Sequence, residues 1–350
     1  MLNLPEQRQI IKQLLTPFPV VRFMNWQQIN RLPHHARPVI KQWSDMLSAD
    51  SDWDYKGGPW DSFRGVPLDI ILDYANEMEV RPWLNIHHAA TDEMIRTMVN
   101  HIIDRSDRRP ILEYSNEIWN GMFVQRGYAS EMGLALGLAD KEWEAPLVYQ
   151  AQRTKVIKDV AGDRADVVIG TQFFNPYLAD LLLQETDGYV DALAVAPYLG
   201  RNQRAVDVLT GDIKTQDELL TELLAEVENE IAPLIAQYAE KAADYGAHLY
   251  AYEGGLHHTA RNTGPDQFLA EREALAEFNR SSDAHLVTTA LWQAWQRNGG
   301  GIACPYSLCT VYENKHNGHL ESTYFGHTEL YGNEIRVWEK YLATLEVLAY

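Results

Sequence analysis

The sequence predicts an α/β protein with a TIM-type (β/α)8 barrel, and three observations favour this fold. Apolar runs of strand length alternate with longer segments of helical period, which is the pattern of repeated βα units around a parallel sheet. Most of these runs end in polar or aromatic residues, as expected where the carboxyl ends of parallel strands line one mouth. The chain has 350 residues, and α/β barrels of about 250 residues or more commonly form one domain. We therefore expect a single domain over residues 1–350.

Seven strands can be identified in order along the chain. They cover residues 19–26, 81–88, 110–117, 166–173, 190–198, 248–254 and 301–308. Helices are predicted at residues 68–78, 91–103, 145–160, 216–245, 265–280, 284–297 and 333–348. The second of these helices begins at Thr91, a residue type that favours helix starts. The connection at 27–67 is long and rich in aromatic residues, which favours a wall of a binding site.

Composition excludes several classes of partner. The formal net charge is −19, from 30 Lys and Arg against 49 Asp and Glu, and it repels phosphate backbones, so no nucleic acid partner is expected. No run of about 18 apolar residues is present, so no membrane span is predicted. Cys304 and Cys309 match neither a disulfide framework nor a zinc Cys-x-x-Cys motif, and we expect two buried thiols. Residues 1–16 lack the pattern of a secretory signal, which leaves the compartment open.

Two glutamates stand at the ends of predicted strands. Glu117 closes the string EYSNE, and Glu253 lies in the string YEGG, with two predicted strands between them. Both strand ends should face the same mouth of a parallel barrel. Cleavage of a glycosidic bond with retention needs one protonated carboxyl group and one ionised carboxylate, so two glutamates in different surroundings suit that chemistry.

The strings SNEIWN and YEGG resemble the acid/base and nucleophile motifs of the large clan of retaining glycosidases (clan A) that includes cellulases, mannanases and β-galactosidases. In that clan the Asn-Glu pair ends the fourth strand and the nucleophile ends the seventh, and the separation of three strands is the same here. The resemblance implies that Glu117 is the acid/base, that Asn116 holds the sugar 2-hydroxyl and that Glu253 is the nucleophile.

The wider string LEYSNEIWN, with VRFMNW and RPWLNIHH, also resembles barrel modules of bacterial polysaccharide-associated proteins. The resemblance covers roughly residues 18–310. It implies hydrolysis of a β-linked oligo- or polysaccharide with no metal or organic cofactor. Oligomeric state and the identity of the glycan are left open.

Further residues near strand ends are candidates for binding the substrate. Arg22 lies in an apolar strand and needs a carboxylate partner; the clan's strand-two arginine implies Glu253, and Glu113 is the structural alternative. A tyrosine at the position of Tyr198 hydrogen-bonds the nucleophile in the clan, whereas simple packing is the other role for it. The remaining candidates are Trp26, Trp60, Asn85, His87, His88, Trp119 and Tyr306, and core packing explains each tryptophan equally well.

Two other classes of protein fit part of the pattern. A metal-dependent barrel hydrolase would use histidines and carboxylates near strand ends, namely His87, His88, His257, His258, Asp92 and Glu253. Adjacent residues of a strand point to opposite faces, so each His pair is expected to offer one inward ligand at best. A non-catalytic carbohydrate-binding protein would keep the aromatic residues without needing an acid.

The strand count indicates that one barrel strand is missing from this chain. Glu117 ends the third predicted strand, whereas the resemblance implies the fourth. The chain opens with a helical pattern at residues 5–15, which would follow strand one, and no segment after Leu308 has enough strand character to replace that strand. We therefore expect a start within a longer parent, for which secretion is compatible with the sequence. A barrel without one strand exposes two sheet edges.

Overall fold

The computed structural model describes most of the chain, and two compact units can be distinguished in it. The described residues are 5–32, 39–50, 65–200, 216–257, 265–310, 315–316, 319–320, 325–331 and 334–349. The first unit comprises residues 1–195 and 240–250, and the second comprises residues 196–239 and 251–350. The single domain expected from the sequence stays a prediction.

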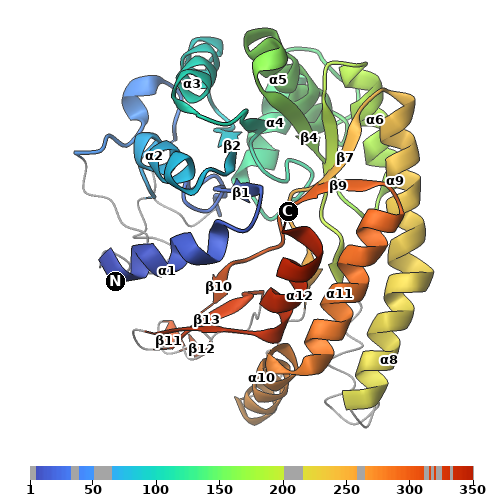
Figure 1. Ribbon diagram of the computed structural model, residues 1–350. Helices are drawn as coiled ribbons and strands as arrows, with labels where there is room; N and C mark the ends of the chain where they lie inside the picture. Colours follow the sequence, from blue (N-terminus) through green and yellow to red (C-terminus); the bar gives the residue numbers. More distant parts are fainter. Residues whose placement is uncertain are drawn as a thin grey trace. The chain divides into compact units, whose positions relative to one another are not determined.

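The central feature of the fold is a seven-stranded sheet in which the strands stand in the order of the sequence (Figure 1). Its strands are β1 (Val20–Arg22), β2 (Arg81–Ile86), β3 (Ile111–Tyr114), β4 (Asp166–Gly170), β5 (Ala192–Val195), β7 (His248–Ala251) and β9 (Gly300–Ala303), in that order. From β1 to β5 each strand pairs with the next in parallel, with Val20 opposite Arg81 and Trp83 opposite Ile111. All seven predicted strands are present, and a sequential parallel sheet with alternating helices is a TIM-type α/β fold.

Helices alternate with the strands, and most begin and end near the predicted limits. They are α1 (Pro5–Leu15), α2 (Leu68–Met78), α3 (Asp92–Arg105), α4 (Val124–Ala135), α5 (Ala145–Ala161), α6 (Pro176–Thr186), α8 (Gln216–Glu226), α9 (Ala232–Asp244), α10 (Pro265–Arg280), α11 (Ser282–Arg297) and α12 (Glu339–Leu348). Thr91 caps α3, because its side chain accepts a hydrogen bond from the Met94 amide at 3.2 Å. A π-helical segment, Val227–Ile231, joins α8 to α9.

Two expectations about local structure are wrong, and two helices were not predicted. The segment predicted as a helix over 333–348 instead holds β14 (Glu334–Val337), which pairs antiparallel with β13 (Thr328–Tyr331), before α12 begins. Two helices, α4 and α6, were not predicted, since α4 carries two glycines and lacks a clear apolar stripe. Cys304 is half-buried and Cys309 is exposed, so the expected pair of buried thiols is not found.

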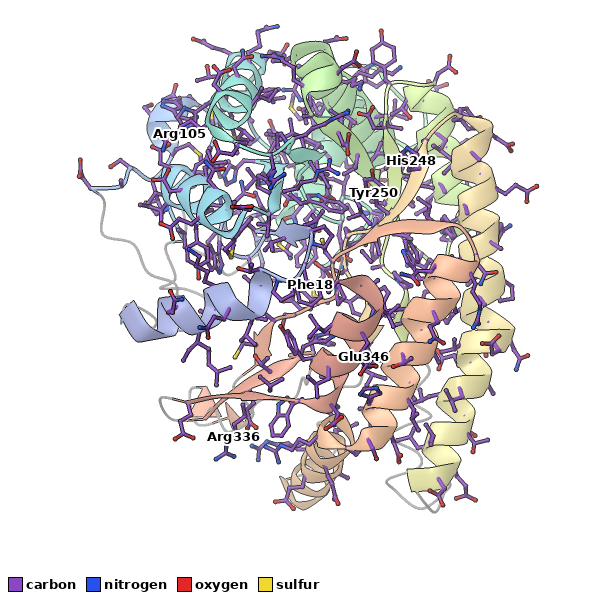
Figure 2. The ribbon with its side chains drawn as sticks, in the orientation of Figure 1. Phe18, Arg105, His248, Tyr250, Arg336 and Glu346 are labelled. Atoms are coloured by element: carbon purple, nitrogen blue, oxygen red, sulfur yellow. The ribbon has the colours of Figure 1, made fainter. Side chains whose placement is uncertain are left out.

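The amino ends of the strands in the first unit carry a cluster of charges. Asp166, at the start of β4, pairs with Arg81 at the start of β2 and with Arg109 at 2.7 Å. Tyr250 lies on β7 next to this cluster and donates a hydrogen bond to Asp166 at 3.4 Å, and its ring stacks on His248 (Figure 2). Burial raises the pKa of Tyr250 to about 12, so the hydroxyl group keeps its proton. Conserved features at this end of a parallel barrel serve stability, and function belongs at the other end.

Short strands lie outside the main sheet. β6 (Tyr198–Leu199) pairs in parallel with β8 (Gly255–Leu256) in the second unit. β10 (Cys309–Thr310) joins β13 and β14, while β11 (Lys315–His316) pairs with β12 (His319–Leu320). None of these described strands joins β1, which stands at one end of the seven-strand order. In the sequence β1 follows α1, as predicted. Across the described residues no helix is long and apolar enough to cross a membrane.

Two glycines of α4 give a matched test of how closely α4 packs on α5. A Cβ atom at Gly133 would lie 2.3 Å from the carbonyl oxygen of Ala145, whereas a Cβ atom at Gly127 would meet nothing within 4 Å. We expect Gly133→Ala to lower the free energy of unfolding by about 1–3 kcal/mol, because backbone must move. Gly127→Ala should raise it by about 0.5–1 kcal/mol, since alanine is the better helix former. Urea denaturation measures both, and equal effects would contradict the close approach.

Candidate active site

The predicted site residues fall on both units, at the carboxyl ends of the strands. In the first unit the ends of β1, β2 and β3 lie side by side, as the hydrogen bond from the Ser115 amide to the Ile86 carbonyl, 2.8 Å long, illustrates. In the second unit Tyr198, Glu253 and Tyr306 come together. Trp60 and His258 lie outside the described residues.

Glu113 is the centre of the arrangement in the first unit. Its side chain is buried, and one oxygen, Oε2, accepts hydrogen bonds from Arg22 at 2.8 Å, from Trp83 Nε1 at 3.0 Å and from Asn85 Nδ2 at 2.9 Å. The Arg22 side chain is also buried, with 5% of its surface exposed. Arg22 therefore binds Glu113, which is one of the two partners predicted for it. A buried ion pair with several hydrogen bonds holds its members in one geometry.

Asn116 is oriented by this ion pair. Its Oδ1 accepts a hydrogen bond from Arg22 Nη2 at 2.7 Å, and its Nδ2 donates to Asn30 Oδ1 at 2.9 Å. Because Arg22 only donates, the amide cannot be turned round without losing this bond. The second N–H of Asn116 has no partner within the described part of the chain, so it is available to a hydroxyl group.

The backbone around Glu117 is strained. Ser115 and Glu117 adopt positive φ angles of 56° and 45°, which residues other than glycine rarely adopt. Gln125, fully buried on α4, donates from Nε2 to the Asn116 carbonyl at 3.1 Å and so holds this segment. The half-buried Glu117 carboxylate accepts a hydrogen bond from Asn120 Nδ2 at 2.8 Å. Such strain collects at functional sites, where the surrounding structure maintains it.

Glu253 is held in the second unit by Tyr198. The Tyr198 hydroxyl group donates to Glu253 Oε2 at 2.8 Å, and Glu253 is 8% exposed. The β6–β8 pair sets this contact, since Tyr198 lies opposite Gly255 and the His257 amide donates to the Leu199 carbonyl at 2.8 Å. Gly254 cannot carry a side chain, because a Cβ atom there would lie 2.9 Å from the Trp292 ring.

Aromatic rings surround Tyr198. His257 lies edge-on to it with ring centroids 4.9 Å apart, and Phe325 contacts both His257, at 5.2 Å, and Tyr306, at 5.7 Å. Tyr306 is a residue that the sequence predicts for the site, whereas Phe325 is not. The only signal for Phe325 was its position in the aromatic connection that follows the last barrel strand.

Two other candidates, Trp26 and Asn85, have structural contacts of their own. Trp26 packs against Phe23 and Tyr74, with ring centroids 5.3 and 5.5 Å from its own. These contacts are those of a residue that serves core packing. Asn85 is fully buried, and its Nδ2 donates to Glu113 and to the Ser115 carbonyl, so it supports the strand end that leads to Glu117. Trp119 is half-buried. A contact of any of them with substrate stays a prediction.

His87 and His88 follow the end of β2, and both are neutral at physiological pH. Burial lowers the pKa of His87 to about 3, and burial with the nearby Arg31 lowers that of His88 to about 4. Because β2 ends at Ile86, the alternation of a strand does not apply to this pair, and both residues line one cavity. Across the described residues, no group of three or more His, Cys, Asp or Glu side chains is placed to hold a metal ion.

The comparisons with known proteins bear on the fold. No family model matches the chain, and no curated protein matches it. Solved structures similar to it are TIM-type α/β enzymes at about 10% identity, a level at which the likeness shows the fold alone.

Three similar structures with TM-scores above 0.5 illustrate the likeness. A family 51 α-L-arabinofuranosidase from Bifidobacterium longum has a TM-score of 0.60 at 10% identity, over 97% of this chain and 66% of that one. Xylanase 10B from Thermotoga maritima has a TM-score of 0.53 at 11% identity, over 99% and 91%. Xylanase 10B from Thermotoga petrophila RKU-1, in complex with xylobiose, has a TM-score of 0.52 at 10% identity, over 99% and 90%. The chain thus spans about two thirds of the arabinofuranosidase.

The stability of the protein should fall as the pH is lowered from about 6.5 to about 5, because buried histidines stay neutral in the folded state. Burial lowers the pKa of His327 to about 3, as it does for His87. The unfolded chain takes up these protons near about pH 6.5, so in this window it binds more protons than the folded chain. Each histidine then lowers the free energy of unfolding by up to about 1.4 kcal/mol per pH unit.

Urea denaturation at a series of pH values measures this dependence. His88→Gln should reduce the slope by one histidine's share. A slope that is the same in the wild type and the variant would contradict a neutral, buried His88.

Proposed function

We propose that the protein is a retaining glycoside hydrolase that cleaves a β-linked glycan by double displacement, with Glu117 as acid/base and Glu253 as nucleophile. The observation that carries the proposal is that each glutamate follows a strand of the same seven-stranded sheet and accepts a hydrogen bond from its own donor. Asn120 donates to Glu117 at 2.8 Å, and Tyr198 donates to Glu253 at 2.8 Å. Two carboxyl groups in different surroundings can hold different protonation states, which this reaction requires.

In the first step the Glu253 carboxylate attacks the anomeric carbon while the bond to the leaving oxygen breaks. Glu117 gives its proton to that oxygen, and a covalent glycosyl-enzyme forms. In the second step Glu117 takes a proton from water, the water oxygen bonds to the anomeric carbon, and Glu253 leaves as a carboxylate. The Tyr198 hydroxyl group stabilises the charge on Glu253 before attack and on departure.

Asn116 and Arg22 have supporting roles in this mechanism. The second N–H of Asn116 would donate to the sugar 2-hydroxyl, an interaction that strengthens in the transition state of such enzymes. Arg22 fixes the Asn116 amide through its 2.7 Å bond and is itself fixed by Glu113. Arg22 is therefore a positioning residue.

The substrate is an oligo- or polysaccharide, and xylan-type glycans are the first to test. This choice rests on the names of the solved structures with a similar fold, two of which are xylanases, one of them in complex with xylobiose. The formal charge of −19 disfavours a polyanionic substrate. A panel of aryl β-glycosides and neutral polysaccharides would identify the substrate.

Substitution of either glutamate should stop turnover. We expect Glu117→Gln to lower kcat on xylo-oligosaccharides by about 10²–10⁴-fold, because the leaving oxygen is no longer protonated. The rate of the first step should fall less on aryl glycosides, whose leaving group needs no proton. Glu253→Gln should abolish turnover on both kinds of substrate.

Glu131→Gln is the matched control, since Glu131 is exposed on α4. It should keep full activity. If Glu117→Gln and Glu253→Gln both bind sugars and turn over as the wild type does, the two glutamates have no catalytic role.

The stereochemistry gives an independent test. A retaining mechanism predicts that the two carboxyl groups face each other at about 5 to 5.5 Å and that the product keeps the β configuration. A crystal structure measures the distance, and NMR of the first product anomer measures the outcome. A separation above about 10 Å would exclude the mechanism, because neither retaining nor inverting geometry extends that far.

A further inference from the structure

We propose that a cavity at the carboxyl ends of β1 and β2 binds one neutral sugar unit through His87 and His88. The cavity has a volume of about 300 Å³ and lies wholly within the first unit. Its description as a subsite of the hydrolysed glycan rests on the proposed function, whereas sugar binding by the cavity does not.

The walls of the cavity come from four parts of the chain. They are the segment after β1, the stretch around the short helix Trp43–Asp45, the start of α2, and the residues that follow β2. The apolar lining residues are Ile29, Ile40, Met46, Leu47, Val66 and Leu68. Such walls suit the C–H face of a sugar ring, and the volume is at the lower end of the range for small-molecule sites, about 300 to 1,000 Å³.

Most polar groups that line the cavity already have partners in the protein. The Gln27 amide group donates to the Asn85 carbonyl at 3.0 Å and accepts from the Asn85 amide at 2.8 Å. Gln28 donates to the Asn25 carbonyl at 2.8 Å, and the Asp45 carboxylate accepts from the Lys41 and Gln42 amides at 2.9 and 3.1 Å. These side chains are therefore engaged with the fold.

His87 and His88 differ from these residues. They are 8% and 6% exposed, and neither imidazole ring has a hydrogen-bond partner within the described ranges of the chain. The His88 ring lies edge-on to Tyr128 at 5.3 Å, and its carbonyl, not its ring, accepts a bond from the Tyr114 hydroxyl group. Both rings line the same cavity, so their unused hydrogen-bonding atoms point to a ligand that supplies hydrogen bonds.

The chemistry of the lining selects a neutral ligand. A neutral imidazole offers one donor and one acceptor, which matches sugar hydroxyl groups, as these both donate and accept. Arg31 and Asp45 both line the cavity, so the lining carries one charge of each sign and favours neither an anionic nor a cationic ligand. The low pKa values of the two histidines, about 3 and about 4, keep this neutral form throughout the working range of most enzymes.

The position of the cavity connects it with Glu117. His87 directly follows β2, and the residue before it, Ile86, accepts a hydrogen bond from the Ser115 amide two residues before Glu117. The cavity is therefore lined by residues of the strand end next to the one that leads to Glu117. A sugar bound there would be a neighbouring unit of the glycan rather than the one attacked.

The test uses the whole chain labelled with ¹³C on histidine rings and titrated with methyl β-D-xylopyranoside and methyl β-D-glucopyranoside. We expect at least one of them to shift the His87 and His88 ring signals in a saturable way. His88→Phe should weaken the binding by about fivefold to tenfold, the value of one neutral hydrogen bond, without lowering the melting temperature. A purely structural role for His88 predicts a lower melting temperature instead.

Two further variants keep the result interpretable if His88→Phe does not fold. Ile40→Trp places a larger side chain in the apolar lining of the cavity and should abolish the shifts. His248→Phe, at an exposed histidine on β7, is the matched control and should leave the affinity unchanged.

Each outcome bears on one proposal. Absence of saturable shifts, shifts that survive Ile40→Trp, or shifts produced by Zn²⁺ and not by sugars would each overturn the sugar site. The same titration on Glu117→Gln separates the two proposals, because the cavity should bind as in the wild type while hydrolysis is lost. Binding without hydrolysis in the wild type would reject the glycosidase and leave the sugar site standing.

Discussion

The ion pair between Arg22 and Glu113 is the interaction on which the candidate site depends. Both side chains are almost fully buried, and the pair joins β1 to β3 across β2. Removing one member would leave an unpaired charge in the interior, at a cost of about 3–5 kcal/mol. Trp83, Asn85 and Asn116 all take their hydrogen-bond geometry from the pair. Stability and catalytic geometry are thus coupled at this point of the fold.

A second layer of polar contacts connects the ion pair to α4. Gln125 donates to Asn30 as well as to the Asn116 carbonyl, and it accepts a bond from the Arg31 amide at 3.3 Å. The segment after β1 and the strained segment after β3 are therefore tied to the same buried side chain. Networks of this kind give an active site a single geometry when every member is satisfied.

The sequence predicted the barrel strands well and the details between them less well. Continuous apolar runs such as those at Leu84 and Val168 are typical of parallel strands buried on both faces, so their positions could be read directly. The helix α4 was missed because Gly127 and Gly133 weaken its pattern, although Gly133 is there to let α5 approach. The apolar residues of segment 334–337 suit both the helical and the strand period, and only the pairing with β13 decides between them.

The site residues also divide into those that the sequence could predict and those that it could not. The motif that contains Glu117 was visible as a string, and so was the one that contains Glu253. The choice between two partners for Arg22 could not be made, because it depends on which side chains meet across strands. Gln125 carried no signal, since it is a single amide on an unpredicted helix. Phe325 carried only the signal of its position, as a single ring in a long connection.

The short β6–β8 pair also has an evolutionary consequence. Inserting one residue between Tyr252 and Gly255 would turn the following side chains to the opposite face and separate Glu253 from Tyr198. Insertions and deletions among related proteins should therefore occur elsewhere in the chain. The spacing from Tyr252 to Gly255 should stay the same even where the loops of these proteins differ.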